Sequence, residues 1–180
     1  NQAYVQGTTI RMMPDCHAGK GSVVGTTMTI SDKIVPFAIG TDIGCGMLIV
    51  DLDDKTVDLQ RLDKCVHNHV PHGSGVNKKL HRWADRVDLT ELRCWSKIPG
   101  SSRKDPRLAI GSMGQNNHFV ELDRDDDGNL YLVIHTGSRN LGLQVANYYQ
   151  QVAHDDLQAR GITDVPFELA YCEGQLFEDY

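Results

Sequence analysis

The chain has 180 residues, a formal net charge of -6, and 40% hydrophobic and 23% charged side chains. This composition is ordinary for a globular protein, and no apolar run approaches the ~20 residues of a membrane-spanning helix, so no membrane role is expected. The charge excludes a uniformly basic surface for nucleic acid. A local basic surface is allowed, because basic residues gather between positions 77 and 107: Lys78, Lys79, Arg82, Arg86, Arg93, Lys97, Arg103, Lys104 and Arg107.

The cysteines indicate the compartment. There are five, an odd number without regular spacing or a secretory signal, which favours a reducing, cytoplasmic location over a disulfide scaffold. The chain begins at Asn1 as if inside a domain and ends on the patterned stretch "YCEGQLFEDY". We therefore expect residues 1–180 to be a single domain, truncated at both ends, from a longer protein.

The first half of the chain is rich in β-branched residues interrupted by glycine and proline. This pattern predicts short strands and tight turns over 21–40 and a further strand over 46–52. Apolar residues at helical spacing predict a helix over 57–70. After a loop, residues 78–87 are compatible with a short amphipathic helix.

The second half contains the clearest elements. Two apolar runs joined by an acidic Asp-Gly-Asn turn predict a β-hairpin over 120–137. A helix is predicted over 142–161, with Gly161 as its stop signal. Strands and helices do not alternate regularly along the chain, so the predicted fold class is α+β.

One turn combines an acid with a thiol. In "AIGTDIGCGM", Asp42 and Cys45 stand three positions apart among glycines. A carboxylate and a thiolate on such a turn can both reach one divalent cation, because small neighbours leave room for a metal and a substrate. A plain turn with a small, hydrophobic cysteine explains the same residues.

Two histidines lie at predicted strand ends. His118 in "GQNNHFVEL" precedes an alternating apolar run, and His135 in "VIHTGSRNLG" ends one. Either could be a hydrogen-bonded structural histidine. The turn after His135 leads into a helix, and Arg139 on it suits a phosphate, although a capped helix with a solvated arginine is common. Taken with Asp42 and Cys45, these residues favour a metal site.

A fourth motif, "MPDCHAGKG", is read as a sharp turn around Pro14. It carries Asp15, His17 and Lys20, which could position a base or bind phosphate, or be a plain surface turn. Its spacing does not match a phosphate-binding P-loop.

Two other strings imitate metal sites. "DRDDDGNLYLVI" begins like a calcium loop, but Ile134 stands where a bidentate glutamate is required. "HNHVPHG" offers three histidines without the cysteine or carboxylate spacing of a zinc site. We reject both.

Four strings in order, "MPDCHAGKGSVVGTT", "AIGTDIGCGM", "GQNNHFVEL" and "IHTGSRNLG", resemble the RtcB family of RNA-splicing ligases, from about Met12 to the chain end. The resemblance implies an α+β fold of its own kind, with β-sheets around a deep polar, metal-binding cleft flanked by helices. It implies an RNA ligase that joins 2′,3′-cyclic phosphate or 3′-phosphate ends to 5′-hydroxyl ends. The implied cofactors are GTP and two Mn²⁺ ions, and the implied partners are broken or intron-cleaved RNA, including tRNA, and an activating helper protein.

The same resemblance implies roles for individual residues. The metal ligands would be Asp42, Cys45, His118 and His135, with the Cys45 thiolate bridging two ions. The nucleotide would be held by Asn117, His118, Phe119 and Glu121. Catalysis would involve Cys45, Asp42 and Asp15, and RNA phosphate would be contacted by His17, Lys20 and Arg139.

Two departures from the family pattern stand out. Asn116 replaces the small residue or glycine that usually precedes the Asn-His pair. The guanylylated histidine and one further metal-binding histidine of the family lie downstream of this chain, and His154 does not match their context. We expect this segment alone to be inactive as a ligase. The alternatives are a metal- or RNA-binding module without ligase activity and a metal-dependent phosphodiesterase.

Overall fold

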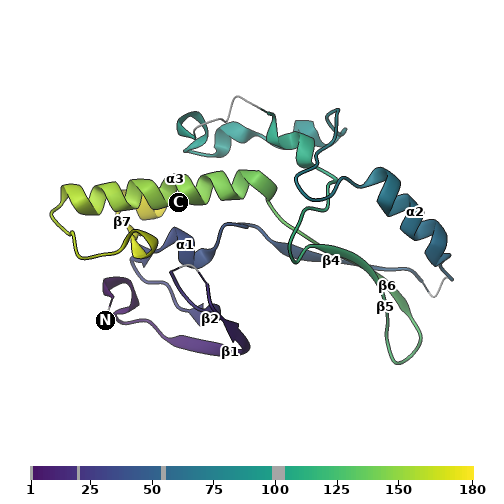
Figure 1. The fold of residues 1–180 in the computed structure, drawn as a ribbon, viewed down its shortest axis with the longest axis horizontal. Helices are drawn as coiled ribbons and strands as arrows, with labels where there is room; N and C mark the ends of the chain where they lie inside the picture. The colour runs from purple at the N-terminus through teal and green to yellow at the C-terminus, as the bar shows by residue number, and fades with distance from the viewer. Residues whose placement is uncertain (1, 20, 54–55, 99–103) are drawn as a thin grey trace. The chain divides into compact units, whose positions relative to one another are not determined.

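The computed structural model describes residues 2–19, 21–53, 56–98 and 104–180. The chain forms two compact units, one of residues 1–43, 92–99 and 142–180 and the other of residues 44–91 and 100–141. Both mix helices with antiparallel strands, so the predicted α+β class is confirmed (Figure 1). Within the described residues, no helix has the length and apolar character needed to cross a membrane.

The first unit contains two small sheets and the longest helix. Strand β1 (Ile10–His17) pairs with β2 (Val24–Met28), and β3 (Lys33–Ile34) pairs with β7 (Cys172–Glu173), both antiparallel. The helices of this unit are α1 (Pro36–Ile39), α3 (Arg139–Ala159), whose first turn belongs to the second unit, and α4 (Gln175–Asp179). Short 3-10 helices complete the unit: η1 (Ala3–Val5), η4 (Trp95–Lys97) and η6 (Phe167–Leu169).

Helix α3 confirms the helix predicted over 142–161 and supplies the core of the first unit. Ala146, Ala153 and Leu157 are at most 1% exposed and lie on one face of the helix. Gly161 follows the helix with a φ of 79°, a left-handed conformation that glycine adopts without penalty. The core is completed by residues far apart in sequence: Tyr4, Val35, Cys94, Ile98, Tyr149, Ala170, Tyr171 and Cys172.

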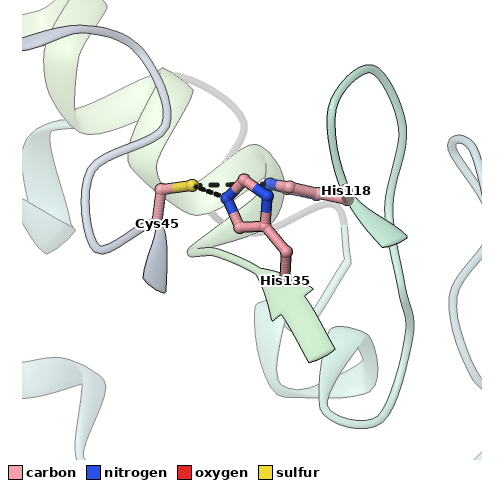
Figure 2. A group of neighbouring side chains, drawn as sticks. All are labelled: Cys45, His118 and His135. Atoms are coloured by element: carbon pink, nitrogen blue, oxygen red, sulfur yellow. Dashed lines mark hydrogen bonds between the residues drawn. The ribbon is translucent and has the colours of Figure 1, made fainter. Parts of the chain in front are cut away.

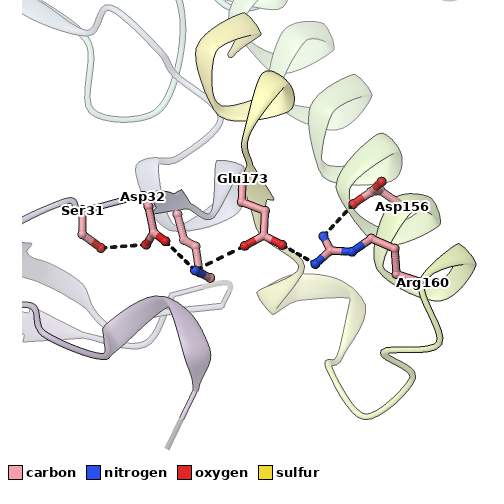
Figure 3. Close-up of polar contacts among 6 residues, drawn as sticks. Ser31, Asp32, Asp156, Arg160 and Glu173 are labelled. Carbon is pink, nitrogen blue, oxygen red and sulfur yellow. Dashed lines mark hydrogen bonds and ion pairs between the residues drawn. The ribbon is translucent and has the colours of Figure 1, made fainter.

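A chain of ion pairs joins β3, β7 and the end of α3 on the surface of this unit (Figure 3). The Lys33 ammonium lies 2.8 Å from Asp32 and 3.2 Å from Glu173, and Glu173 also pairs with Arg160. The hydrogen bond from Lys33 lowers the pKa of Asp32. The side chains of Lys33 and Glu173 are only 19% and 22% exposed, whereas Asp32 and Arg160 are exposed to solvent. Because the outer partners are solvated, each of their ion pairs adds only modestly to stability.

The second unit is built on a three-stranded antiparallel sheet in the order β4-β6-β5. Strand β4 (Gly46–Asp51) and strand β5 (Phe119–Arg124) flank the central strand β6 (Leu130–Thr136), so the predicted strand and the predicted hairpin are confirmed (Figure 1). Its 3-10 helices are η2 (Ala84–Arg86), η3 (Leu89–Glu91) and η5 (Pro106–Ala109).

Asp125 closes the β5–β6 turn. Its carboxylate accepts hydrogen bonds from the backbone N–H groups of Asp127 and Asn129, and from the side chains of Asn129 and Tyr131. These bonds, led by that from the Asn129 side chain, lower the pKa of Asp125. The carboxylate thus stabilises the hairpin turn.

The helix predicted over 57–70 is confirmed as α2 (Leu59–His69). Asp58 is its N-cap, and its carboxylate accepts a hydrogen bond from the Arg61 backbone N–H at 3.0 Å. An aspartate at this position satisfies one of the unpaired N–H groups of the first turn.

Three local predictions were wrong. Residues 78–87 do not form an α-helix and contain only the 3-10 turn η2. The His81 side chain accepts a hydrogen bond from the Trp83 N–H, which gives the backbone a partner other than a helical carbonyl. "IVPFAI" contains the helical turn α1, which begins at Pro36, a residue suited to a first helical position. Asp15 and His17 lie on β1 rather than on a turn.

The Pro14 region of β1 is nevertheless irregular. Met12 pairs with Thr26 and His17 with Val24, so five steps on β1 match two on β2. Proline cannot donate to a strand ladder, and a bulge accommodates it.

Candidate metal centre

Three strand ends of the second unit bring a thiol and two imidazoles together. Cys45 directly precedes β4, His118 directly precedes β5, and His135 is the penultimate residue of β6. Gly46 pairs with Thr136, and Phe119 pairs with His135, so the register places all three residues at one end of the sheet. Figure 2 shows their side chains converging there.

The donor atoms are close enough to share an ion. One ligand atom from each of Cys45, His118 and His135 lies within 4.8 Å of the others. The Cys45 Sγ lies 2.7 Å from the His135 Nε2 and 3.9 Å from the His118 Nε2. Within the described residues this is the group of acidic, thiol and imidazole side chains arranged to hold a metal ion.

The chemistry of these donors fits a divalent transition metal. Two ligands on one tetrahedral ion, with bonds of about 2.3 Å to sulfur and about 2.0 Å to nitrogen, stand roughly 3.6 Å apart. The 3.9 Å separation suits that arrangement, whereas the 2.7 Å separation is a direct thiol–imidazole contact that must widen. Thiolate and imidazole alone favour zinc, iron or copper, and a carboxylate is needed to favour manganese.

Arg139 contacts His118 at the Nδ1 atom, whereas the Nε2 atom of the same ring faces Cys45. The Arg139 Nη2 donates to the Gly73 carbonyl at 2.7 Å, and its Nη1 lies 3.5 Å from the His118 Nδ1. The longer distance is at the limit of a hydrogen bond, so this contact fixes the ring's position rather than its tautomer. A Cβ on Gly114 would clash with both the Arg139 Nη1 and the His118 Nδ1. Only glycine leaves room for this pair.

The loop after α2 is tied to the same region. The Gly73 N–H donates to the Gly114 carbonyl at 2.7 Å, and the Met113 N–H donates to the Pro71 carbonyl at 2.8 Å. Thr136 of β6 donates its hydroxyl to the Met113 carbonyl at 2.8 Å. The loop therefore supports the segment that carries His118.

The fourth expected metal ligand and the expected nucleotide-binding residues lie within a few positions of Cys45 or His118 in the sequence. Asp42 is half-buried and belongs to the first unit, and the three-residue group does not include it. Asn117 and Glu121 are exposed, while Phe119 packs edge-on against the His135 ring, with centroids 5.2 Å apart. Because side chains alternate along a strand, Phe119 and Glu121 share a sheet face with His135. Their roles stay predictions.

The residues expected to act on RNA are placed differently. Asp15 and His17 are exposed on β1, with the His17 Nδ1 bonded to the Asp15 carbonyl at 3.0 Å. Lys20 lies outside the described residues. Arg139 is occupied by Gly73 and His118, so a positioning role is visible that the sequence did not suggest. The signal that could have indicated it is the glycine in "GSMGQNNH", at Gly114.

The turns that carry the donors need special backbone conformations. Gly44, directly before Cys45, has a φ of 80°, and Asn116, two residues before His118, has a φ of 65°. Asparagine is the residue that tolerates the left-handed region best after glycine. Asn116 therefore keeps the conformation that a glycine would give.

The fold and the Cys–His–His group define an α+β domain with a candidate transition-metal centre. The model of the family described as tRNA-splicing ligase RtcB matches residues 2–180, and the chain belongs to this family.

Curated relatives agree with this assignment. The chain is 30% identical over 190 residues to RNA-splicing ligase RtcB of Escherichia coli (strain K12), covering 95% of this chain and 47% of that protein. It is 28% identical to tRNA-splicing ligase RtcB of Methanococcus maripaludis, covering 76% of this chain and 39% of that protein. The chain thus spans less than half the length of these two relatives.

Proposed function

We propose that the chain is the metal-binding part of an RNA ligase that joins 2′,3′-cyclic phosphate or 3′-phosphate RNA ends to 5′-hydroxyl ends. The observation that carries this proposal is the convergence of Cys45, His118 and His135 at one sheet end, in a chain whose relatives are named RNA- or tRNA-splicing ligases. GTP and Mn²⁺ are the proposed cofactors, and RNA with broken or intron-cleaved ends is the proposed substrate.

Cys45, His118 and His135 would hold the metal, with Asp42 as the proposed carboxylate ligand that suits manganese. A bound pair of divalent ions would supply Lewis-acid stabilisation of charge on a phosphate. The Cys45 side chain is exposed, so its thiolate is accessible both to an ion and to a substrate. Arg139 would keep the His118 ring in place from its far side.

Asn117 and Glu121 would contact the guanine nucleotide. Both are exposed, and both lie next to the strand end that carries His118. The histidine that takes up the guanylate is proposed to lie outside this segment, because His154 is part of helix α3 and packs against Phe167 instead. The segment alone would therefore bind metal and RNA ends without joining them.

The test measures Mn²⁺ binding by electron paramagnetic resonance on the purified chain, wild type against Cys45→Ala, with Cys65→Ala as control. Cys65 is an exposed cysteine on α2 and is absent from the three-residue group. We expect tight binding that is lost in Cys45→Ala and kept in Cys65→Ala. Equal binding by wild type and Cys45→Ala would overturn the metal assignment.

A second measurement separates the alternatives. The Mn²⁺-loaded chain is titrated with one RNA sequence ending in a 3′-hydroxyl, a 3′-phosphate or a 2′,3′-cyclic phosphate. A ligase segment should bind the phosphorylated ends more tightly and leave the RNA length unchanged. Opening of the cyclic phosphate or cleavage of the RNA by the chain alone would favour a phosphodiesterase, and indifference to the end would favour a simple binding module.

A further inference from the structure

The segment after the loop at Gly73 presents an aromatic ring close to two cations. Trp83 is 49% exposed, and the guanidinium carbons of Arg82 and Arg86 each lie 5.7 Å from its ring centroid. The His81 ring packs edge-on against it, with centroids 5.1 Å apart. The next residue, Ala84, is only 1% exposed and anchors the turn, so the tryptophan is held at the surface.

This surface is locally basic on a chain that is acidic as a whole. Residues 78–87 contain four lysines and arginines against the single acid Asp85, while the chain carries a formal net charge of -6. In the part of the chain that the structure describes, none of these four cations forms an ion pair. Their charge is free to meet an external anion. We name this surface the Trp83 patch: Lys78, Lys79, His81, Arg82, Trp83 and Arg86.

The Trp83 patch starts close to the candidate metal centre. Gly73, whose carbonyl accepts the hydrogen bond from Arg139, is five residues before Lys78, a reach of at most ~17 Å of extended chain. Asn77 fixes the start of the patch, because its backbone N–H donates to the Leu108 carbonyl at 3.0 Å and its side chain donates to the Ile110 carbonyl at 2.8 Å.

We propose that the Trp83 patch binds single-stranded RNA, with a base stacked on Trp83 and neighbouring phosphates contacted by Lys78, Lys79, Arg82 and Arg86. This inference rests on the proposed function for the identity of the RNA as substrate. Exposed aromatic rings interleaved with cations are the means by which proteins bind single strands, since every base has a face to stack. A duplex hides those faces, and a membrane surface needs a longer amphipathic helix than the three residues of η2.

The chain offers a built-in reporter for this interaction. It has two tryptophans, so Trp95→Phe leaves Trp83 as the single one. We would titrate the purified Trp95→Phe chain with an eight-nucleotide single-stranded RNA, in a chelator-containing buffer that removes the metal centre from the measurement. Stacking should quench the Trp83 fluorescence as the RNA binds.

Variants of the wild-type chain then test the energetics by fluorescence anisotropy of labelled RNA. Trp83→Ala should weaken binding by about tenfold or more, and Trp83→Phe, which keeps a ring, should lose less. The double variant Lys78→Ala and Lys79→Ala should lower the slope of the logarithm of the binding constant against the logarithm of salt concentration by about 1.4 in magnitude, because two phosphate contacts are lost. Arg61→Ala, at an exposed arginine on α2 of the same unit, is the matched control and should leave affinity nearly unchanged.

The outcomes are separable from those of the proposed function. The patch is overturned if Trp83→Ala and Trp83→Phe bind RNA as the wild type does, or if a duplex of the same sequence binds equally well and quenches nothing. If the chain does not bind Mn²⁺ or does not prefer phosphorylated RNA ends, while the Trp83 variants still weaken RNA binding, the ligase proposal is contradicted and RNA binding by the Trp83 patch stands. If Mn²⁺ binding and the preference for phosphorylated ends are observed but the Trp83 variants bind RNA normally, the ligase proposal stands and RNA binding by the Trp83 patch is contradicted.

Discussion

Gly114 lies so close to His118 that any side chain larger than hydrogen on the glycine would overlap the His118 Nδ1. The same absent Cβ leaves space for the Arg139 guanidinium, which reaches past the imidazole to the Gly73 carbonyl. A glycine, an arginine and a loop carbonyl thus fix the position of one candidate metal ligand. The precision of the site depends on residues that bind no metal themselves.

We first expect Gly114→Ala to weaken Mn²⁺ binding by about tenfold or more, since the new methyl group displaces His118 and Arg139. The control is Gly111→Ala. Both glycines have positive φ values, 110° and 80°, so both variants carry backbone strain, but a Cβ on Gly111 would meet only the Asn77 side chain, at 3.8 Å. Metal titration of the two variants separates the steric effect from the strain, and equal losses would show that strain alone matters.

Arg139→Lys should also weaken Mn²⁺ binding by about tenfold in the absence of RNA. Lysine keeps the charge but cannot contact both Gly73 and His118 as the planar guanidinium does. The control is Arg124→Lys, because Arg124 likewise donates to a glycine carbonyl, that of Gly128, at 2.8 Å. If metal affinity is unchanged while binding of 3′-phosphate RNA falls, Arg139 is a phosphate contact instead, as the sequence suggested.

The local elements could be predicted because their signals are local. The hairpin around Asp125 follows from alternating residues and turn chemistry, and α2 and α3 follow from apolar spacing, with Gly161 as the stop signal of α3. The helix predicted over 78–87 was wrong. The hydrogen bond from the Trp83 N–H to the His81 side chain competes with helix formation, and apolar spacing alone does not reveal this competition.

The site itself could be predicted only in part. Cys45 was recognisable on a glycine-rich turn, and His118 and His135 at predicted strand ends. The strand order β4-β6-β5, however, is a long-range pairing that local spacing does not specify. Gly114 is recognisable as a glycine close to His118, but local spacing could not assign its role, because that role depends on Arg139, 25 positions later in the chain. Steric relationships between distant residues leave no periodic trace in a sequence.

A third prediction concerns the turn before His118. Asn116 has a φ of 65°, so Asn116→Ala should lower the free energy of unfolding by about 1 kcal/mol, whereas Asn116→Gly should be nearly neutral. Urea unfolding of both variants provides the measurement. Equal stability of the alanine variant and the wild type would mean that this turn adopts another conformation in solution.

A fourth prediction concerns Gln150, which is fully buried in α3. Its Oε1 accepts from the Phe37 N–H at 3.0 Å, and its Nε2 donates to the carbonyls of Phe167 and Ala170. Gln150→Ala leaves three backbone groups without this partner and should cost about 3 kcal/mol or more of unfolding free energy.

The neighbouring Gln151→Ala is the control for Gln150→Ala. Gln151 is exposed and its side-chain amide donates to the solvated Asp155 carboxylate, so its loss should change the unfolding free energy by less than about 0.5 kcal/mol. Thermal unfolding of the pair decides the matter. Similar melting temperatures for the two variants would contradict a structural role for the buried glutamine.

The last prediction concerns the alkaline limit of the first unit. Burial raises the pKa of the Cys172 thiol from 9.0 to about 12. The folded state thus favours the neutral thiol, and this contribution to stability is complete below the unfolded pKa of about 9 and is lost as the pH rises through the folded value. Burial raises the pKa of Tyr180 to about 12 and that of Tyr149 as well, so they act in the same direction. Urea midpoints should fall steadily above pH 9.

Cys172→Ala measures how much of the stability loss above pH 9 is due to the Cys172 thiol. The variant should be less stable at pH 7, since it removes a fully buried side chain, but its stability should fall less steeply above pH 9, by up to one proton released per molecule. Cys65→Ala, at an exposed cysteine, should keep the slope of the wild type. Parallel curves for Cys172→Ala and the wild type from pH 9 to 11 would mean that Cys172 does not stay neutral in the folded chain, and the tyrosines would then account for the alkaline loss.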